Sequence, residues 1–233
     1  MRCILSPLLV GLFMASSVLA AGASLAWGQR LEVTVTNVTK SEYFTPLLIV
    51  SHTDDFRLFS PGGDASNELE QLAEGGDTGP LLASLEGRLD VHSAVATDGL
   101  LGPGETVTVE ISSGSRFNPR RGQFTRVSVV AMLIPTNDTF VAVNGALRPN
   151  RAGETVRIQA PAYDSGTEAN DELCDNMPGP FGCPGTGEGF NASRDGAEGF
   201  IYVSNGIQGV GDLPAPTWDW HNPVASVSIT ILQ

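Results

Sequence analysis

Residues 124–143, FTRVSVVAMLIPTNDTFVAV, hold the pattern that decides the fold. Phe124 to Ile134 and Thr139 to Val143 carry β-branched residues in alternation, which predicts two strands. The polar stretch between them begins with proline and contains asparagine and aspartate, as turns do. The alternation is of the antiparallel kind, so this part of the chain predicts an antiparallel sheet.

The same pattern continues in both directions along the chain. It predicts further strands at 31–36, 91–96, 105–112, 154–159, 200–203 and 224–232. An apolar run at 45–51 predicts a strand buried on both faces. Short helices are predicted at 66–74 and 78–86, since each begins at a capping residue and ends at glycine. About eight strands without a linker or repeat predict an all-β antiparallel β-sandwich, one domain over residues 31–233.

The net negative charge of the chain limits the ligands that it is expected to bind. The chain has 233 residues, of which 26 are acidic and 13 are lysine or arginine, and its formal net charge is −13. Phosphate backbones would repel such a chain, so nucleic-acid binding is excluded. The same acidity suits divalent cations.

The first 26 residues have the composition of a secretory signal peptide. Arg2 gives a positive start, residues 3–20 are almost entirely apolar or small, and further small residues follow. We expect cleavage after Ala23 or Ala26; an uncleaved membrane anchor is the alternative. No second long apolar run occurs, so the mature chain is not expected to span a membrane. The mature protein is therefore expected to be secreted, periplasmic or at the cell surface.

Removal of this leader leaves two cysteines, Cys174 and Cys183. They lie within residues 164–199, where the lack of apolar periodicity predicts a long loop. In an exported chain, two cysteines this close are expected to form a disulfide. A metal-binding pair is the alternative, although two cysteines without a nearby histidine make a poor zinc site.

Two loops carry the oxygen-bearing residues that calcium prefers. Ile134 to Phe140 includes Asn137 and Asp138, and Ala162 to Glu172 includes Asp164. Both loops follow predicted strands, so they could meet at one end of the sandwich around a calcium ion. The alternative is that these aspartates and asparagines only begin turns.

Signs of catalysis are few. The sequence has no nucleophile elbow, no zinc-protease motif and no phosphate loop. His52 lies beside two aspartates and could bind a metal, but a solvated side chain is the simpler interpretation. A secreted hydrolase using carboxylates such as Asp54, Asp55 or Glu168 is the alternative function. A structural envelope component is a further alternative.

Several stretches resemble the spondin N-terminal domain, which occurs in F-spondin, in mindin and in many bacterial secreted proteins. Residues 134–143 are similar to the family's PSPDWFVGV stretch, and Ala162–Glu168 to its YDAGTD stretch. Weaker similarity lies in Tyr43-Phe44-Thr45-Pro46, in the Gly75-Gly76-Asp77 break between the helices and in Asn222–Val227. The resemblance covers about residues 31–233.

This resemblance implies an antiparallel sandwich that holds a calcium ion at one end. The implied ligands are Asp138, Asp164 and, from the strand at 105–112, Glu110. It also implies a non-catalytic adhesion or ligand-recognition module whose partner is an extracellular protein or glycan. Thr139 and Glu168 stand where animal members have tryptophan and aspartate, a departure that bears on partner recognition more than on metal binding.

Overall fold

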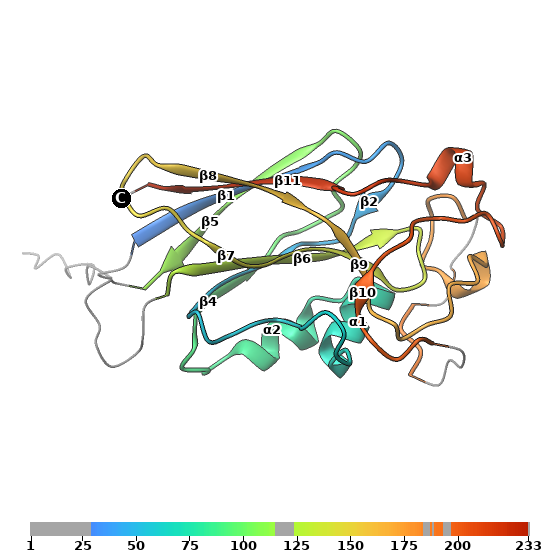
Figure 1. Cartoon of the computed structure of the whole chain (residues 1–233), viewed down its shortest axis with the longest axis horizontal. Coiled ribbons are helices and arrows are strands. Elements are labelled where there is room, and N and C mark those ends of the chain that lie inside the picture. The colour runs from blue at the N-terminus through green and yellow to red at the C-terminus, as the bar shows by residue number, and fades with distance from the viewer. Residues whose placement is uncertain (1–28, 115–123, 184–186, 188, 193–196, 233) are drawn as a thin grey trace, which may run out of the picture.

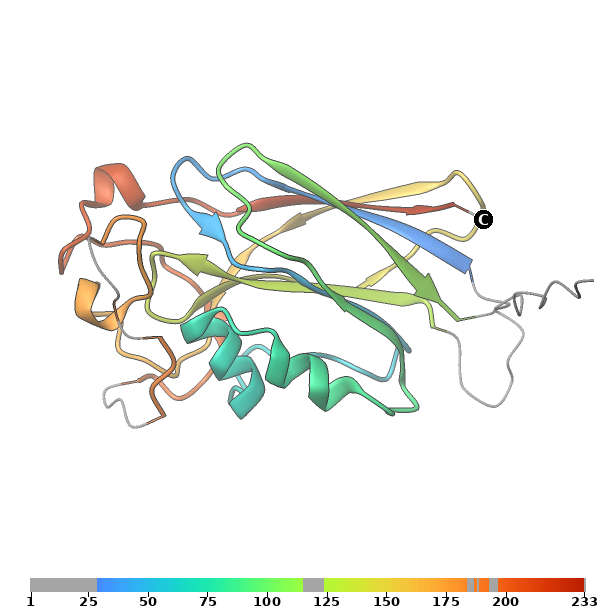
Figure 2. The same ribbon diagram turned by 180° about the vertical axis from the view of Figure 1, so that it is seen from behind.

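The structure, a computed structural model, describes residues 29–114, 124–183, 187, 189–192 and 197–232. The expected signal peptide lies outside these residues. Two antiparallel sheets pack face to face, and helices cover the outer face of one of them (Figures 1 and 2). The expected β-sandwich is thus confirmed, with eleven strands in the described residues rather than about eight.

One sheet has four strands. Their order is β5 (Thr106–Ser113), β1 (Gln29–Asn37), β11 (Ala225–Ile231) and β8 (Thr155–Ala160). Each neighbouring pair is antiparallel. In β1, Leu31, Val33 and Val35 are buried and the residues between them are not, because one face packs on the core and the other faces solvent.

The other sheet is larger and is built around the 124–143 stretch. Its order is β10 (Tyr202–Val203), β9 (Ala162–Asp164), β7 (Thr139–Leu147), β6 (Arg126–Ile134), β3 (Leu48–His52) and β4 (Val91–Ala96), with β2 (Tyr43–Phe44) paired to β6. After its first residue β6 is buried along its whole length, so its side chains pack on both faces of the sheet.

Two apolar cores explain this two-sided burial. Val129 and Leu133 belong to the core between the two sheets. Val130 belongs to the core beneath the helices, where it packs with Leu69 and Leu72. The continuous apolar run of residues 129–134 therefore reflects a central strand covered on both faces.

The two predicted helices are confirmed as α1 (Asn67–Gly75) and α2 (Gly79–Leu85). The Ser66 side chain caps α1 by accepting a hydrogen bond from the Leu69 backbone N–H at 3.3 Å. Gly76 ends this helix in the left-handed region, with φ 69°. A Cβ at this position would lie 2.5 Å from Cγ2 of Thr45, so both the turn and the packing require glycine.

Some short elements were not predicted. These are β2, β9, a single 3-10 turn η1 (Cys174–Asn176) and α3 (Ala215–Trp218). Elements of two to four residues are too short to show a period, and β9 forms because β7 offers it a free edge. The strand predicted at 200–203 is shorter in the structure, and the strand predicted at 139–143 extends to Leu147.

The expected disulfide between Cys174 and Cys183 is confirmed. It cross-links the long connection between β9 and β10, in which η1 is the one helical turn among the described residues. Among the helices of the described residues, none has the length and apolar character needed to cross a bilayer.

Candidate functional site

Asp138 and Asp164 lie side by side at one end of the larger sheet. Asp138 ends the turn between β6 and β7, and Asp164 is the last residue of β9. The antiparallel pairing of β7 with β9 sets Thr139 opposite Asp164. The backbone N–H of Ser165 also donates to the carbonyl of Asp138 at 3.2 Å. The structure therefore brings together the two loops that the sequence singled out.

The Asp138 side chain is fully buried and its two oxygens differ. Oδ2 accepts hydrogen bonds from the Ser165 hydroxyl at 3.0 Å and from the backbone N–H groups of Thr167 and Glu168 at 2.8 and 3.1 Å. Oδ1 is buried and has no hydrogen-bond partner among the described residues. Burial raises the pKa of Asp138, and the hydrogen bonds to Oδ2 oppose that rise.

Asp164 is held in a similar way and is 1% exposed. Its Oδ1 accepts from the backbone N–H of Gly166 at 2.9 Å, and its Oδ2 accepts from the Asn170 amide at 2.9 Å. Burial and then the negative charge of Asp138 raise the pKa of Asp164 to about 7. None of the ion pairs among the described residues includes either aspartate. The pair is therefore a buried anionic site without a cationic side chain.

Gly166 shapes the loop that follows Asp164. Its φ is +68°, and a Cβ there would lie 2.3 Å from the carbonyl oxygen of Phe200. The Gly166 carbonyl in turn accepts from the N–H of Gly199 at 2.9 Å. The turn thus presses against the segment before β10, and only glycine allows both the conformation and the approach.

Residues far from the two loops complete the surroundings. Tyr202 on β10 receives a hydrogen bond from the Asn170 amide at 3.0 Å and donates one to Glu198 at 3.1 Å. No role was predicted from the sequence for Tyr202 and Glu198, because Tyr202 reaches Asn170 only through the pairing of β10 with β9. Asn137 and Asn170 lay in the quoted loops, but no single-sequence signal separated them from ordinary turn residues.

A second layer of contacts fixes the position of the Asp138 turn. Asn137 donates from its amide to Asp171 at 3.0 Å and accepts from the backbone N–H of Glu172 at 3.1 Å. The Glu172 carboxylate in turn accepts from the backbone N–H groups of Gln208 and Val210. The turn, the loop after β9 and the segment after β10 therefore form one hydrogen-bonded unit.

The structure does not bring Glu110 to this site. Glu110 lies on β5 in the four-stranded sheet, where its carboxylate pairs with Arg30 at 3.0 Å and both side chains are more than half exposed. The alternation of β5 turns Ile111 inward and Glu110 outward, so Glu110 faces solvent on the far side of that sheet. The ligand role that the resemblance implied for Glu110 finds no support in this placement.

Of the carboxylates considered for hydrolysis, Glu168 lies apart from the adjacent Asp54 and Asp55. Asp54 pairs with Arg126 at the start of β6 at 2.8 Å, whereas the backbone of Glu168 contacts Asp138 beyond the other end of that strand. A nine-residue strand is about 26 Å long, so Asp54 and Glu168 cannot act on one bond. His52 is fully buried rather than solvated, and its ring nitrogens pair with the Thr53 carbonyl and the Ser128 hydroxyl.

The carboxylate oxygens of Asp138 and Asp164 suit a hard cation, but the pair alone offers too few ligands to surround it. Among the described residues, no three or more His, Cys, Asp or Glu side chains gather where they could hold a metal. The unpartnered Oδ1 of Asp138 and the carboxylate of Asp164 offer oxygen, which calcium prefers. Hydroxyl or carbonyl oxygens of the loops, and water, would have to supply the other ligands. The electrostatics of the pair therefore fit calcium with two carboxylates rather than three.

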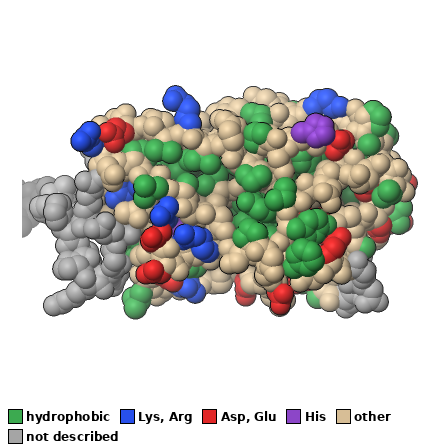
Figure 3. All heavy atoms as spheres, in the orientation of Figure 1, with side chains coloured by type: hydrophobic (Ala, Val, Ile, Leu, Met, Phe, Trp, Pro, Cys, Tyr) green, Lys and Arg blue, Asp and Glu red, His purple; other side chains and the backbone are tan. Residues whose placement is uncertain are grey.

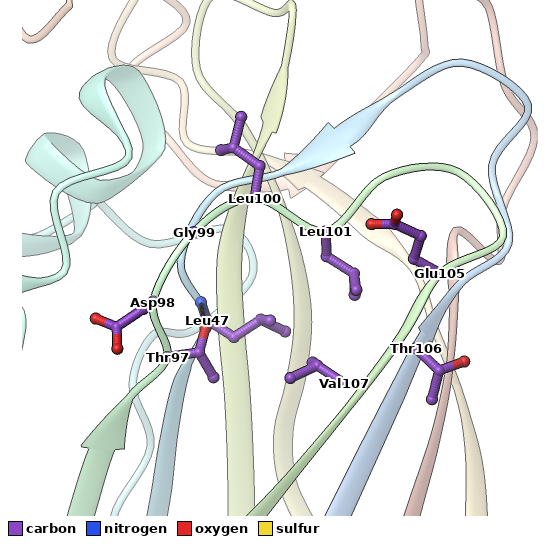
Figure 4. A pocket seen from close by; sticks show the side chains of 9 residues that line it. All are labelled: Leu47, Thr97, Asp98, Gly99, Leu100, Leu101, Glu105, Thr106 and Val107. Carbon is purple, nitrogen blue, oxygen red and sulfur yellow. Dashed lines mark hydrogen bonds between the residues drawn. The ribbon is translucent and has the colours of Figure 1, made fainter.

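A separate hollow lies away from the aspartate pair. It has a volume of about 440 Å³ and opens between the start of β5 and the loop after β4 (Figure 4). Leu47, Leu101 and Val107 line it together with Asp98 and Glu105, and none of the described lining residues is histidine or cysteine. On the face shown in Figure 3, charged side chains of both signs are scattered, so this face offers no continuous charged surface.

Comparison with known families identifies the fold family of this chain. The family model Spondin_N matches residues 35–171, which include both aspartates of the pair. No curated protein matches this chain.

Proposed function

We infer the function of this chain from one premise: it belongs to the Spondin_N family, whose model covers more than half of its length. The family supports an extracellular module of recognition or adhesion, and it is not known as an enzyme family. We propose that this chain is an exported, non-catalytic recognition module for an extracellular protein or glycan, and that it binds one calcium ion at Asp138 and Asp164. Export by the expected leader, residues 1–26, is part of this proposal.

The buried aspartate pair is the observation that carries the calcium proposal. Burying an unpaired carboxylate is costly, and burying two beside each other adds their repulsion. The raised pKa of Asp164 expresses this cost. A bound dication would offset both terms, since calcium is attracted to both carboxylates and accepts oxygen ligands in flexible geometry. The unpartnered Oδ1 of Asp138 supports the proposal, because its lone pairs are free to bind an ion.

The surrounding residues would prepare the site before the ion arrives. The N–H groups of Thr167 and Glu168 orient Asp138, while Asn170 and Gly166 orient Asp164. Calcium, when bound, would supply the positive charge that ties the β6–β7 turn to the loop after β9. The effect would be a rigid end of the sandwich, on which a recognition surface can be built.

Thermal unfolding of the mature chain with and without calcium tests this proposal. At calcium concentrations 100 times the dissociation constant, binding adds about 2.7 kcal/mol to the free energy of unfolding. In a domain of this size, that raises Tm by about 5–10 °C. Asp138→Asn is expected to abolish the increase without unfolding the metal-free protein, because an asparagine can keep the hydrogen bonds that Oδ2 accepts.

Glu110→Gln is the matched control. It removes one exposed carboxylate outside the pair and is expected to keep the full calcium response. An unchanged Tm of the wild type in calcium, or an unchanged response in Asp138→Asn, would reject the site. A response lost in Glu110→Gln alone would show that the ion sits elsewhere.

A further inference from the structure

Glu42 is a second buried carboxylate, at a different place from the aspartate pair. It lies between β1 and β2, is 1% exposed, and neither of its carboxylate oxygens has a hydrogen-bond partner among the described residues. Its backbone is firmly fixed, since the Glu42 carbonyl accepts from the Asn37 amide at 2.7 Å and from the Thr39 hydroxyl at 2.9 Å. The chain therefore holds an unsatisfied acid in a defined position.

Asp219 approaches this acid from the other end of the sequence. It follows α3 directly and is half-buried, and its backbone N–H donates to the Ala215 carbonyl at 2.8 Å. Two hydrogen bonds join the same segments, from Lys40 to the Pro216 carbonyl and from Ser41 to the Thr217 carbonyl. In Figures 1 and 2, β2 and α3 lie at the same end of the molecule. Burial and the charge of Asp219 raise the pKa of Glu42 well above its usual value.

Gly206 packs directly against the Asp219 carboxylate. A Cβ on Gly206 would lie 2.3 Å from Oδ1 of Asp219 and 3.3 Å from the carbonyl oxygen of Trp220. A side chain at position 206 would clash with Oδ1 of Asp219, so glycine allows the close approach and the Asp219 carboxylate is held beside the Gly206 backbone.

The described residues provide no cationic side chain for this pair of acids. None of their ion pairs includes Glu42 or Asp219. Lys40, the single lysine of the chain, lies two residues from Glu42 but donates to the Pro216 carbonyl. The two negative charges are therefore left for a ligand to balance.

We propose that Glu42 and Asp219 bind a hard divalent cation of the calcium class, at a second site independent of the Asp138–Asp164 pair. Two carboxylates match the charge of a dication, and all the donors are oxygen. Backbone carbonyls and water supply the remaining ligands, because the site has only two acidic side chains. The ion joins the β1–β2 connection to the segment that leads into β11.

Calcium titration calorimetry of the mature chain tests this proposal with four proteins: wild type, Asp138→Asn, Glu42→Gln and the double variant. We expect two equivalents of calcium in the wild type, one in each single variant and none in the double variant. Asp219→Asn, a milder change at a half-buried position, is expected to behave as Glu42→Gln does. Asp98→Asn, which alters an exposed acid, is expected to keep both equivalents.

The outcomes separate the two sites. If Glu42→Gln and Asp219→Asn leave the stoichiometry unchanged, Glu42 holds a proton rather than an ion and the second site is rejected. If Asp138→Asn alone removes all binding, the second site is also rejected while the first stands. If Asp138→Asn changes nothing and Glu42→Gln removes all binding, the first site fails and the second is supported.

Discussion

At the scale of single residues, burial changes what an ionisable side chain can do. Asp164 has a pKa near 7 because it is buried beside Asp138. His52 shows the opposite direction: burial lowers the pKa of its ring, which stays neutral between the Thr53 carbonyl and the Ser128 hydroxyl. Such a shift makes stability depend on pH.

We predict that acid destabilises the protein through His52. Below about pH 6.5 the ring takes up a proton in the unfolded chain but not in the folded one, so the free energy of unfolding falls as pH decreases. His52→Gln is expected to weaken this decline between pH 6.5 and 5, measured by urea unfolding at each pH. Groups with raised pKa values, such as Asp164, act in the opposite direction but are common to both proteins.

His221→Gln provides the comparison, because His221 is exposed. It should follow the wild-type pH dependence. A His52→Gln protein whose stability declines as steeply as the wild type would contradict the assignment.

The residue scale also shows where prediction from the sequence succeeded. Asp138 and Asp164 were predicted to meet because the loops that hold them follow predicted strands. In the structure, the pairing of β7 with β9 brings the two aspartates together. Glu110 was assigned by resemblance alone, and the alternation of β5 turns its side chain to solvent instead. Glu42 and Asp219 carry no sequence signal, because 176 residues separate them and only the closed fold brings their segments together.

At the scale of elements, local chemistry decides what can be predicted. Helix α1 was predicted because Ser66 and Gly76 mark its ends within the sequence itself. Strand β9 has three residues and exists only through its pairing with β7 and β10, so tertiary contacts define it. The loop after β9 also depends on tertiary contacts, since Gly166 must fit against Phe200.

We predict that Gly166→Ala destabilises the protein by more than the cost of placing an alanine at positive φ. A positive φ costs an alanine about 1 kcal/mol, and the Phe200 carbonyl lies where the methyl group would go. Gly99→Ala measures the cost of the positive φ alone, because Gly99 has φ +72° and no atom lies within 4 Å of the added Cβ. Chemical denaturation is expected to give a loss for Gly166→Ala at least twice that for Gly99→Ala. Equal losses would mean that the loop moves freely.

At the scale of the whole molecule, two cores share one central sheet. The larger sheet packs on the smaller one through Val129 and Leu133, and on the helices through Val130. The disulfide lies outside the strands of both sheets, in the connection between β9 and β10, and its Cys183 is buried in the core between the sheets. Its contribution should therefore be to stability rather than to the choice of fold.

We predict that the double variant Cys174→Ser/Cys183→Ser folds but is less stable. Closing a loop of about ten residues removes unfolded-chain entropy worth about 2–3 kcal/mol, which the variant loses. Far-UV circular dichroism is expected to be unchanged, and Tm to fall by about 4–12 °C. A variant without β-sheet signal would show that the cross-link is needed for folding itself.

The place of β11 has a consequence for the proposed export of the chain. This strand is the last in the sequence, yet it lies in the middle of the smaller sheet, between β1 and β8. Strand β1 therefore lacks its partner β11 during synthesis, and the smaller sheet closes only after residues 225–231 have been made. Until then the smaller sheet stays incomplete, so under the proposed export the chain would reach a translocation channel unfolded and would complete its folding after crossing.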